Sequence, residues 1–184
     1  MGIKSSVFIA TSLEGFIARK NGELDWLPGS DGQAAEEDLG YDQFIAGVDA
    51  LVMGRNTYEL VQTFGEWPYG GKRVVVLSSR LPKIPERLAE GVEGSSASPV
   101  ELMRQLQLSG STHVYVDGGK TIQSFLRANL IQEITISRVP ILLGEGIPLF
   151  GPLVGDIKLR HESTKAFNNG LVQSRYSIPE AVSL

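Results

Sequence analysis

The sequence predicts an α/β fold: a central, mostly parallel sheet with helices on both faces and an antiparallel C-terminal hairpin. Three observations support this prediction. Short apolar or β-branched runs alternate with segments of helical periodicity. The runs are almost continuously apolar, which is typical of strands covered on both faces. The last part of the chain instead places two strand-like segments around an Asn-Gly pair.

Five runs bounded by Gly, Pro, Ser or Asp are predicted as strands, at residues 6–10, 50–53, 74–77, 114–116 and 134–139. Helices are predicted between them, at residues 34–46, 56–64, 99–108 and 121–128. Strands that alternate with helices along the chain favour a parallel sheet, because each helix returns the chain to the same edge.

The third predicted helix has the clearest boundaries. Ser98 and Glu101 have the spacing of a capping box, and Pro99 occupies the first helical position. Gly110 lies just past the predicted end.

The C-terminal segments 158–163 and 171–177 flank Asn168-Asn169-Gly170. Asn and Gly tolerate the positive φ angles that a tight turn demands, so an antiparallel hairpin is predicted here.

Composition favours one domain over residues 1–184 and excludes several classes of function. The net charge is −4 and no Lys/Arg run exceeds two residues, so neither nucleic acid nor an anionic membrane is an expected partner. The chain has no cysteine, and His113 and His161 lack partners at metal-ligand spacing, so we expect no metal site. No signal sequence and no apolar run near the ~18 residues of a membrane helix is visible, so a cytoplasmic location is expected.

Three successive strand–helix junctions carry groups suited to a phosphorylated ligand. The segments are 54–57, 78–80 and 117–121, and they contribute glycines, hydroxyls and cations. Ligands of open α/β sheets bind at the carboxyl ends of the strands, where we expect these segments to meet. Gly119-Lys120-Thr121 does not complete a P-loop, because the first glycine of that motif would fall at Val114.

Several motifs resemble the dihydrofolate-reductase superfamily. Residues 12–18, Ser-Leu-Glu-Gly-Phe-Ile-Ala, are similar to the Ser-Leu-Asp-Gly-x-Ile-Ala stretch of its riboflavin branch. Residues 53–59 resemble the Met-Gly-Arg-x-Thr-x-Glu of the folate enzymes, and residues 143–150 resemble a Leu-Gly-x-Gly-x-Pro-Leu-Phe segment of the riboflavin branch. The chain therefore resembles the reductase domain of the riboflavin-biosynthesis deaminase-reductases and their stand-alone relatives.

The resemblance implies an NADPH site. Ala10 and Thr11 would contact the nicotinamide carboxamide through the backbone, with Ile17 near the ring. The phosphate-binding residues would be Gly54, Arg55 and Thr57, then Ser78, Ser79 and Arg80 for the 2′-phosphate, and Gly118, Gly119, Lys120 and Thr121 for the pyrophosphate. The family's cis peptide would fall between Gly118 and Gly119.

The resemblance also places a carboxylate beside the substrate, at Asp38, with Glu37 adjacent and Glu36 as an alternative. A buried carboxylate with a raised pKa can supply the proton that accompanies hydride addition. The other reading is a solvated acidic first turn of a helix. Trp26, Tyr41 and Phe44 are the expected substrate contacts, although apolar residues at helical spacing also form cores.

The pattern departs from the folate enzymes at Lys72, where they carry an arginine that forks onto the substrate's carboxylate. The resemblance therefore implies a reductase of a ribosyl-linked pyrimidine, as a homodimer. A dihydrofolate or pterin reductase and a non-catalytic NADP-binding module remain the alternatives.

Overall fold

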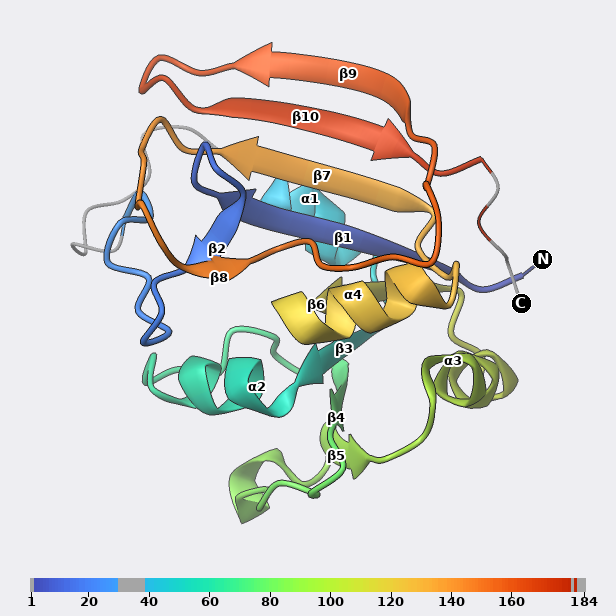
Figure 1. The fold of residues 1–184 in the computed structure, drawn as a ribbon. Helices are drawn as coiled ribbons and strands as arrows, with labels where there is room; N and C mark the ends of the chain where they lie inside the picture. The colour runs from blue at the N-terminus through green and yellow to red at the C-terminus, as the bar shows by residue number, and fades with distance from the viewer. Residues whose placement is uncertain (1, 30–38, 180, 182–184) are drawn as a thin grey trace.

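The computed structural model describes residues 2–29, 39–179 and 181. Within them, one sheet has the strand order β5-β4-β3-β6-β1-β7-β10-β9 (Figure 1). Its parallel strands are β1 (Lys4–Thr11), β3 (Ala50–Gly54), β4 (Arg73–Leu77), β5 (Val92–Ser95), β6 (His113–Asp117) and β7 (Glu133–Arg138). Strand β10 (Val172–Ser177) is antiparallel to both β7 and β9 (Arg160–Ala166). The predicted fold class is confirmed.

Helices cover both faces of the sheet. α3 (Pro99–Leu108) and α4 (Gly119–Arg127) pack on one face, and α1 (Tyr41–Ala46) and α2 (Arg55–Gln62) pack on the other. The residues of β3 alternate between the two layers: Val52 joins the α3–α4 core, and Leu51 joins the α2 core. This double burial explains why the strand sequences show no polar alternation.

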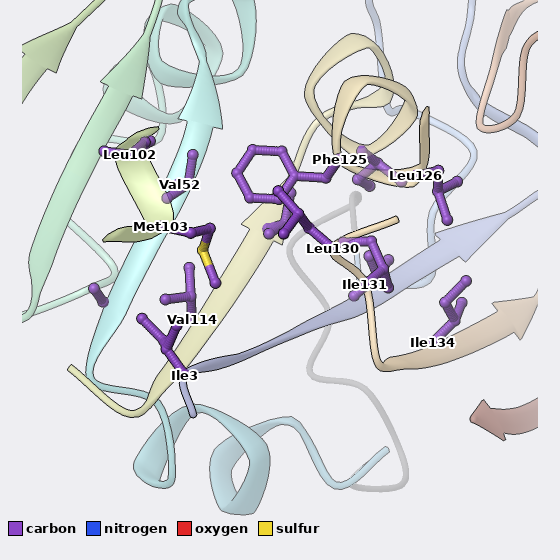
Figure 2. Packing of buried hydrophobic residues seen from close by; sticks show 14 of the residues in the cluster. Ile3, Val52, Leu102, Met103, Val114, Phe125, Leu126, Leu130, Ile131 and Ile134 are labelled. Carbon is purple, nitrogen blue, oxygen red and sulfur yellow. The ribbon is translucent and has the colours of Figure 1, made fainter. Parts of the chain in front are cut away.

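The core beneath α3 and α4 holds most of the large apolar side chains. Met103 from α3 and Phe125 from α4 meet Val52 and Val114 of the sheet (Figure 2). Each such side chain contributes about 1.5–3 kcal/mol when it is fully buried. This packing fixes the helices, and with them the junctions at the carboxyl edge of the sheet.

Three strands were not predicted from the sequence. β5 contains only one buried residue, Val92, and β2 (Phe16–Ala18) and β8 (Ile147–Pro148) are too short for a periodic pattern. β2 and β8 pair with each other as a ribbon outside the main sheet. Such strands are specified by tertiary pairing rather than by local sequence.

The C-terminal hairpin is confirmed with shifted limits. β9 starts at Arg160 rather than at residue 158, and it continues to Ala166. Its connection is longer than a two-residue turn, since the Phe167 N–H donates to the Leu171 carbonyl and Gly170 has φ 85°. All seven residues of β9 are exposed, so no apolar pattern marked the start of this edge strand.

Helix α3 has the predicted boundaries, and its capping box is present in full. The helix predicted at 34–46 is shorter in the described part, because α1 begins at Tyr41 after Gly40, which has φ 80°. Leu39 and Gly40 are not helical, and residues 34–38 lie outside the described residues. No described helix is long and apolar enough to cross a bilayer.

Candidate active site

The three predicted junctions lie side by side at one edge of the sheet. β4, β3 and β6 are neighbours in the strand order, and Met53 at the end of β3 pairs with Asp117 at the end of β6. The segments that follow these strands therefore share the carboxyl edge, as predicted, but the segment after β4 leads through a 3-10 turn (Glu86–Leu88) to β5 rather than to a helix. β1 lies on the other side of β6, so Ala10 and Thr11 border the same region.

The turns after β3 and β6 interlock. A Cβ on Gly118 would lie 2.5 Å from Thr57 Oγ1, and a Cβ on Gly54 would lie 2.9 Å from Thr121 Oγ1. Gly118 also has φ 89°, which L-residues rarely adopt. Two glycines and two threonines thus bring the starts of α2 and α4 into contact.

Both helices present their N-termini without a side-chain cap. Gly54 is the N-cap of α2 and Gly118 is the N-cap of α4, and no side chain among the described residues caps either N-terminus. The first N–H groups of a helix lack intrahelical partners, and the helix dipole adds positive potential there. Two such ends in contact form a site suited to an anion with two phosphates.

The peptide between Gly118 and Gly119 is not cis, because the described residues contain no cis bond. The expectation of a cis peptide here was wrong. The positive φ of Gly118 makes the turn without it. Gly119 is needed for packing, since its Cβ would lie 3.0 Å from Ile17 Cδ1 and 3.1 Å from the Pro148 carbonyl oxygen.

Residues 78–80 extend this edge beyond β4. The Ser78 N–H donates to the Ser95 carbonyl, and the Ser78 hydroxyl accepts from the Arg80 N–H at 3.2 Å. Ser79 and Arg80 are exposed, and Arg80 makes no salt bridge with the described residues. Arg55 at the start of α2 lies 3.5 Å from Glu59, while Lys120 at the start of α4 is exposed.

A gap in strand pairing separates the ends of β1 and β6. Their ladder stops at Ser6 and Tyr115, although β1 continues to Thr11 beside β7. The Tyr115 hydroxyl donates to the Phe8 carbonyl at 2.9 Å across this gap. Thr11 Oγ1 is buried and has no hydrogen-bond partner among residues 2–29, 39–179 and 181. The backbone of Ala10 is therefore outside the β1–β6 ladder, as a contact with a planar amide would require, whereas the Thr11 carbonyl accepts the Val139 N–H on the β7 side.

Asp117, at the end of β6, is a half-buried titratable group that no sequence motif singled out. Burial raises the pKa of its carboxyl to about 6, against a hydrogen bond from the Gly118 N–H that lowers it. Its negative charge in turn contributes to the raised pKa of the hydroxyls of Tyr41, Tyr69 and Tyr115, for which burial is the larger cause. In the sequence, Asp117 could have been recognised as a candidate because it is an acidic residue directly after a buried strand and before two glycines.

Aromatic rings gather over the middle of β1 and β6, where Phe44 also meets His113, at the start of β6, edge-on at 5.9 Å. Phe8 stacks on Phe44 at 4.9 Å, and Tyr41 meets Phe8 edge-on at 5.6 Å. Phe8, Tyr41 and Phe44 are partly exposed, whereas Tyr115 beneath them is buried. The predicted contacts Tyr41 and Phe44 thus lie together, and Phe8 joins them. This is an aromatic surface suited to a flat heterocycle.

Other predicted residues lie elsewhere. Trp26 packs in a separate cluster with Val139, Phe167 and Leu171, and its buried indole N–H has no partner. Lys72 donates from Nζ to the Val48 carbonyl at 2.8 Å, where β3 and β4 begin.

Glu36, Glu37 and Asp38 lie outside the described residues. The described residues contain no cluster of three or more His, Asp or Glu that could hold a metal ion. His113 contacts the Ser6 hydroxyl and the Gly47 carbonyl, and His161 contacts Thr164.

Comparison with known proteins identifies a family of which this chain is a member. The model of the RibD C-terminal domain matches residues 5–173. The uncharacterised protein YwjB of Bacillus subtilis (strain 168) is 34% identical over 175 residues, which cover 94% of this chain and 97% of YwjB.

Solved structures agree. A Shewanella sp. PV-4 protein, whose name places it provisionally in riboflavin biosynthesis, is 40% identical with a TM-score of 0.88, and the match covers 95% of this chain and 98% of that one. A Thermotoga maritima diaminohydroxyphosphoribosylaminopyrimidine deaminase/5-amino-6-(5-phosphoribosylamino)uracil reductase has a TM-score of 0.74 at 15% identity, over 96% of this chain and 57% of that one. The latter likeness concerns the fold alone. The resemblance predicted from the motifs is thus confirmed, and the chain belongs to the RibD C-terminal domain family.

Proposed function

We propose that this chain is an NADPH-dependent reductase of a small heterocyclic substrate, most closely a pyrimidine that carries a ribosyl group. The observation that carries the proposal is the contact between two uncapped helix N-termini, at Gly54 and Gly118, with the half-buried Asp117 carboxyl bonded to the Gly118 N–H. An anion site next to a proton donor is the arrangement that a dinucleotide-dependent reduction requires.

The residues present fit NADPH. The pyrophosphate would bind the N–H groups of residues 55–57 and 119–121, and Thr11 Oγ1 is an unpaired buried hydroxyl at the nicotinamide end. Ser78, Ser79 and Arg80 would hold the 2′-phosphate, because a guanidinium and hydroxyls suit a phosphate dianion. When bound, NADPH supplies a hydride.

The protein must supply the matching proton. Asp117 is the described carboxyl best placed for this, because a group with a pKa of about 6 is still about one tenth protonated at pH 7, far more than an ordinary carboxyl. Asp38 and Glu37 are the second source that we propose, on the segment before α1. The rings of Phe8, Tyr41 and Phe44 would orient the substrate by stacking.

A folate substrate is less well supported. Lys72 offers a point charge where folate enzymes offer a planar fork, and its ammonium is already bonded to the Val48 carbonyl. By family relationship we also propose that the protein acts in the cytoplasm, as a single domain and a homodimer.

The test is loss of NADPH absorbance with the purified protein. We expect oxidation with 5-amino-6-(5-phosphoribosylamino)uracil and much slower oxidation with dihydrofolate. Faster turnover of dihydrofolate would assign a pterin reductase. Tight NADPH binding without oxidation would assign a binding module, and no binding at millimolar NADPH would refute the proposal.

A further inference from the structure

Two loops on the β1 side of the candidate site are joined to each other. The first follows β1 at residues 12–15, and the second follows β7 at residues 139–146. The Leu13 N–H donates to the Ile141 carbonyl at 3.0 Å, and the Leu149 N–H donates to the Gly15 carbonyl at 2.9 Å. These loops lead into β2 and β8, which pair as the small ribbon in front of the main sheet (Figure 1).

The ribbon forms a wall of the candidate cofactor site. Its residues Ile17 and Pro148 lie against the place where a Cβ of Gly119 would be, at 3.0 and 3.1 Å. Gly119 is the first residue of α4. The position of the ribbon therefore sets the space beside the first turn of that helix.

The ribbon has few hydrogen bonds of its own. β2 has three residues and β8 has two, with an irregular register between Phe16 and Ala18. A ribbon of this length is marginal without support from other contacts. Part of the support comes from α4, whose Gln123 Nε2 donates to the Pro148 carbonyl at 3.3 Å, and part comes from the loops that precede its strands.

The Glu14 carboxylate provides such support. Oε2 accepts the Leu143 N–H at 2.7 Å, and Oε1 accepts the Gly144 N–H at 2.8 Å. Gly144 has φ 79°, a left-handed conformation that glycine adopts without strain. These bonds, with the one from Leu143 the largest influence, lower the pKa of Glu14, so the carboxylate is charged at neutral pH.

We propose that Glu14 is a positioning residue that ties the two loops together and holds the β2–β8 ribbon against the first turn of α4, and thereby sets the affinity for the cofactor. The identity of the cofactor in this inference rests on the proposed function, whereas the hydrogen bonds of Glu14 are independent of it. Two charge-assisted bonds from one carboxylate to successive backbone N–H groups are stronger than neutral bonds. The two carboxylate oxygens are engaged by backbone N–H groups of the second loop, so we expect cofactor binding rather than turnover to depend on Glu14.

The test compares Glu14→Gln and Glu14→Asp with Glu145→Gln as the matched control. Glu145 lies in the same loop after β7 and pairs with Lys20, which follows β2, at 2.6 Å through exposed side-chain tips. For Glu14→Gln we expect the KM for NADPH to rise about tenfold while kcat stays within about twofold. Glu14→Asp keeps the charge and should give an intermediate KM, whereas Glu145→Gln should match the wild type.

A second readout needs no ligand. Amide hydrogen exchange at Leu143 and Gly144 should accelerate at least about tenfold in Glu14→Gln and remain at the wild-type rate in Glu145→Gln. Exchange and KM values in Glu14→Gln that equal those of the wild type would overturn the proposal, as would a loss of kcat and melting temperature at constant KM. If the wild type fails to bind NADPH, the proposed function fails, and the exchange rates still decide the role of Glu14.

Discussion

Helix α3 and helix α4 both begin at the carboxyl edge of the sheet, but their first turns are completed in different ways. In α3 the Ser98 hydroxyl accepts from the Glu101 N–H, and the Glu101 carboxylate accepts from the Ser98 N–H at 3.0 Å. In α4 the N-cap is Gly118, which has no side chain to offer. The protein closes one N-terminus with its own groups and leaves the other open, and the same is true of α2. Two adjacent helix N-termini that both lack a cap therefore indicate a site for an anion, whereas a capped N-terminus does not.

The largest effect is expected when a side chain is added at the uncapped N-terminus of α4. In Gly118→Ala the added Cβ meets Thr57 Oγ1 at 2.5 Å, and the residue must hold φ 89°. We expect a loss of about 2–4 kcal/mol in unfolding free energy and at least a hundredfold weaker NADPH binding. Chemical denaturation and fluorescence titration measure the two effects.

The control for this variant is Gly110→Ala, after α3. Gly110 has φ 93°, but a Cβ there would meet nothing within 4 Å. Its cost should be the backbone strain alone, about 1–2 kcal/mol, with NADPH binding unchanged. Equal NADPH affinities in the two variants would contradict the difference between the helix ends.

The next largest effect tests whether Arg80, after the end of β4, binds the 2′-phosphate of NADPH. Arg80→Ala should weaken NADPH binding about 10- to 100-fold, or ~1.4–2.8 kcal/mol, and NADH binding less than about threefold. Lys83→Ala removes a nearby exposed cation and should change neither. Equal losses for both cofactors in Arg80→Ala would remove the 2′-phosphate from this position.

Asp117 gives a pH-dependent prediction. Its pKa is raised from 3.8 to about 6 in the folded protein, so the folded state holds the proton more tightly than the unfolded chain. Asp117 therefore costs stability progressively as the pH rises from about 4 through 6. Asp117→Asn should remove that loss and raise the unfolding free energy at pH 8 by about 1–2 kcal/mol, below the ~3 kcal/mol limit for full burial.

The same variant tests the proton source. If the protonated Asp117 is the acid, the wild-type kcat falls as the pH rises through about 6, and Asp117→Asn turns over slowly at every pH with NADPH binding retained. An unchanged profile in Asp117→Asn together with a slow Asp38→Asn would move the role to Asp38.

The smallest effect is expected for a substitution at the capped N-terminus of α3. Ser98→Ala removes the cap of α3 and should lower the unfolding free energy by about 1 kcal/mol. NADPH affinity should stay at the wild-type value, because this N-terminus is occupied by Glu101. Weaker NADPH binding in this variant would show that α3 belongs to the site.

The contrast also explains what the sequence could predict. The limits of α3 were predicted correctly because Ser98, Pro99 and Glu101 form local interactions that mark a helix start in the sequence itself. β5 and β8 could not be found this way, since Val92 or Pro148 forms a strand only against a partner distant in the chain. The junctions at Gly54 and Gly118 were recognised by type, and their mutual contact required the strand order. Asp117 was missed because its raised pKa comes from burial, which the sequence alone does not give.

The most direct test of the central claim is a map of amide shifts in a ¹H–¹⁵N correlation spectrum during an NADPH titration. We expect the largest shifts at residues 55–57 and 119–121, with Val100 and Glu101 at the start of α3 unchanged. Unchanged spectra at millimolar NADPH, or shifts centred on α3, would contradict it.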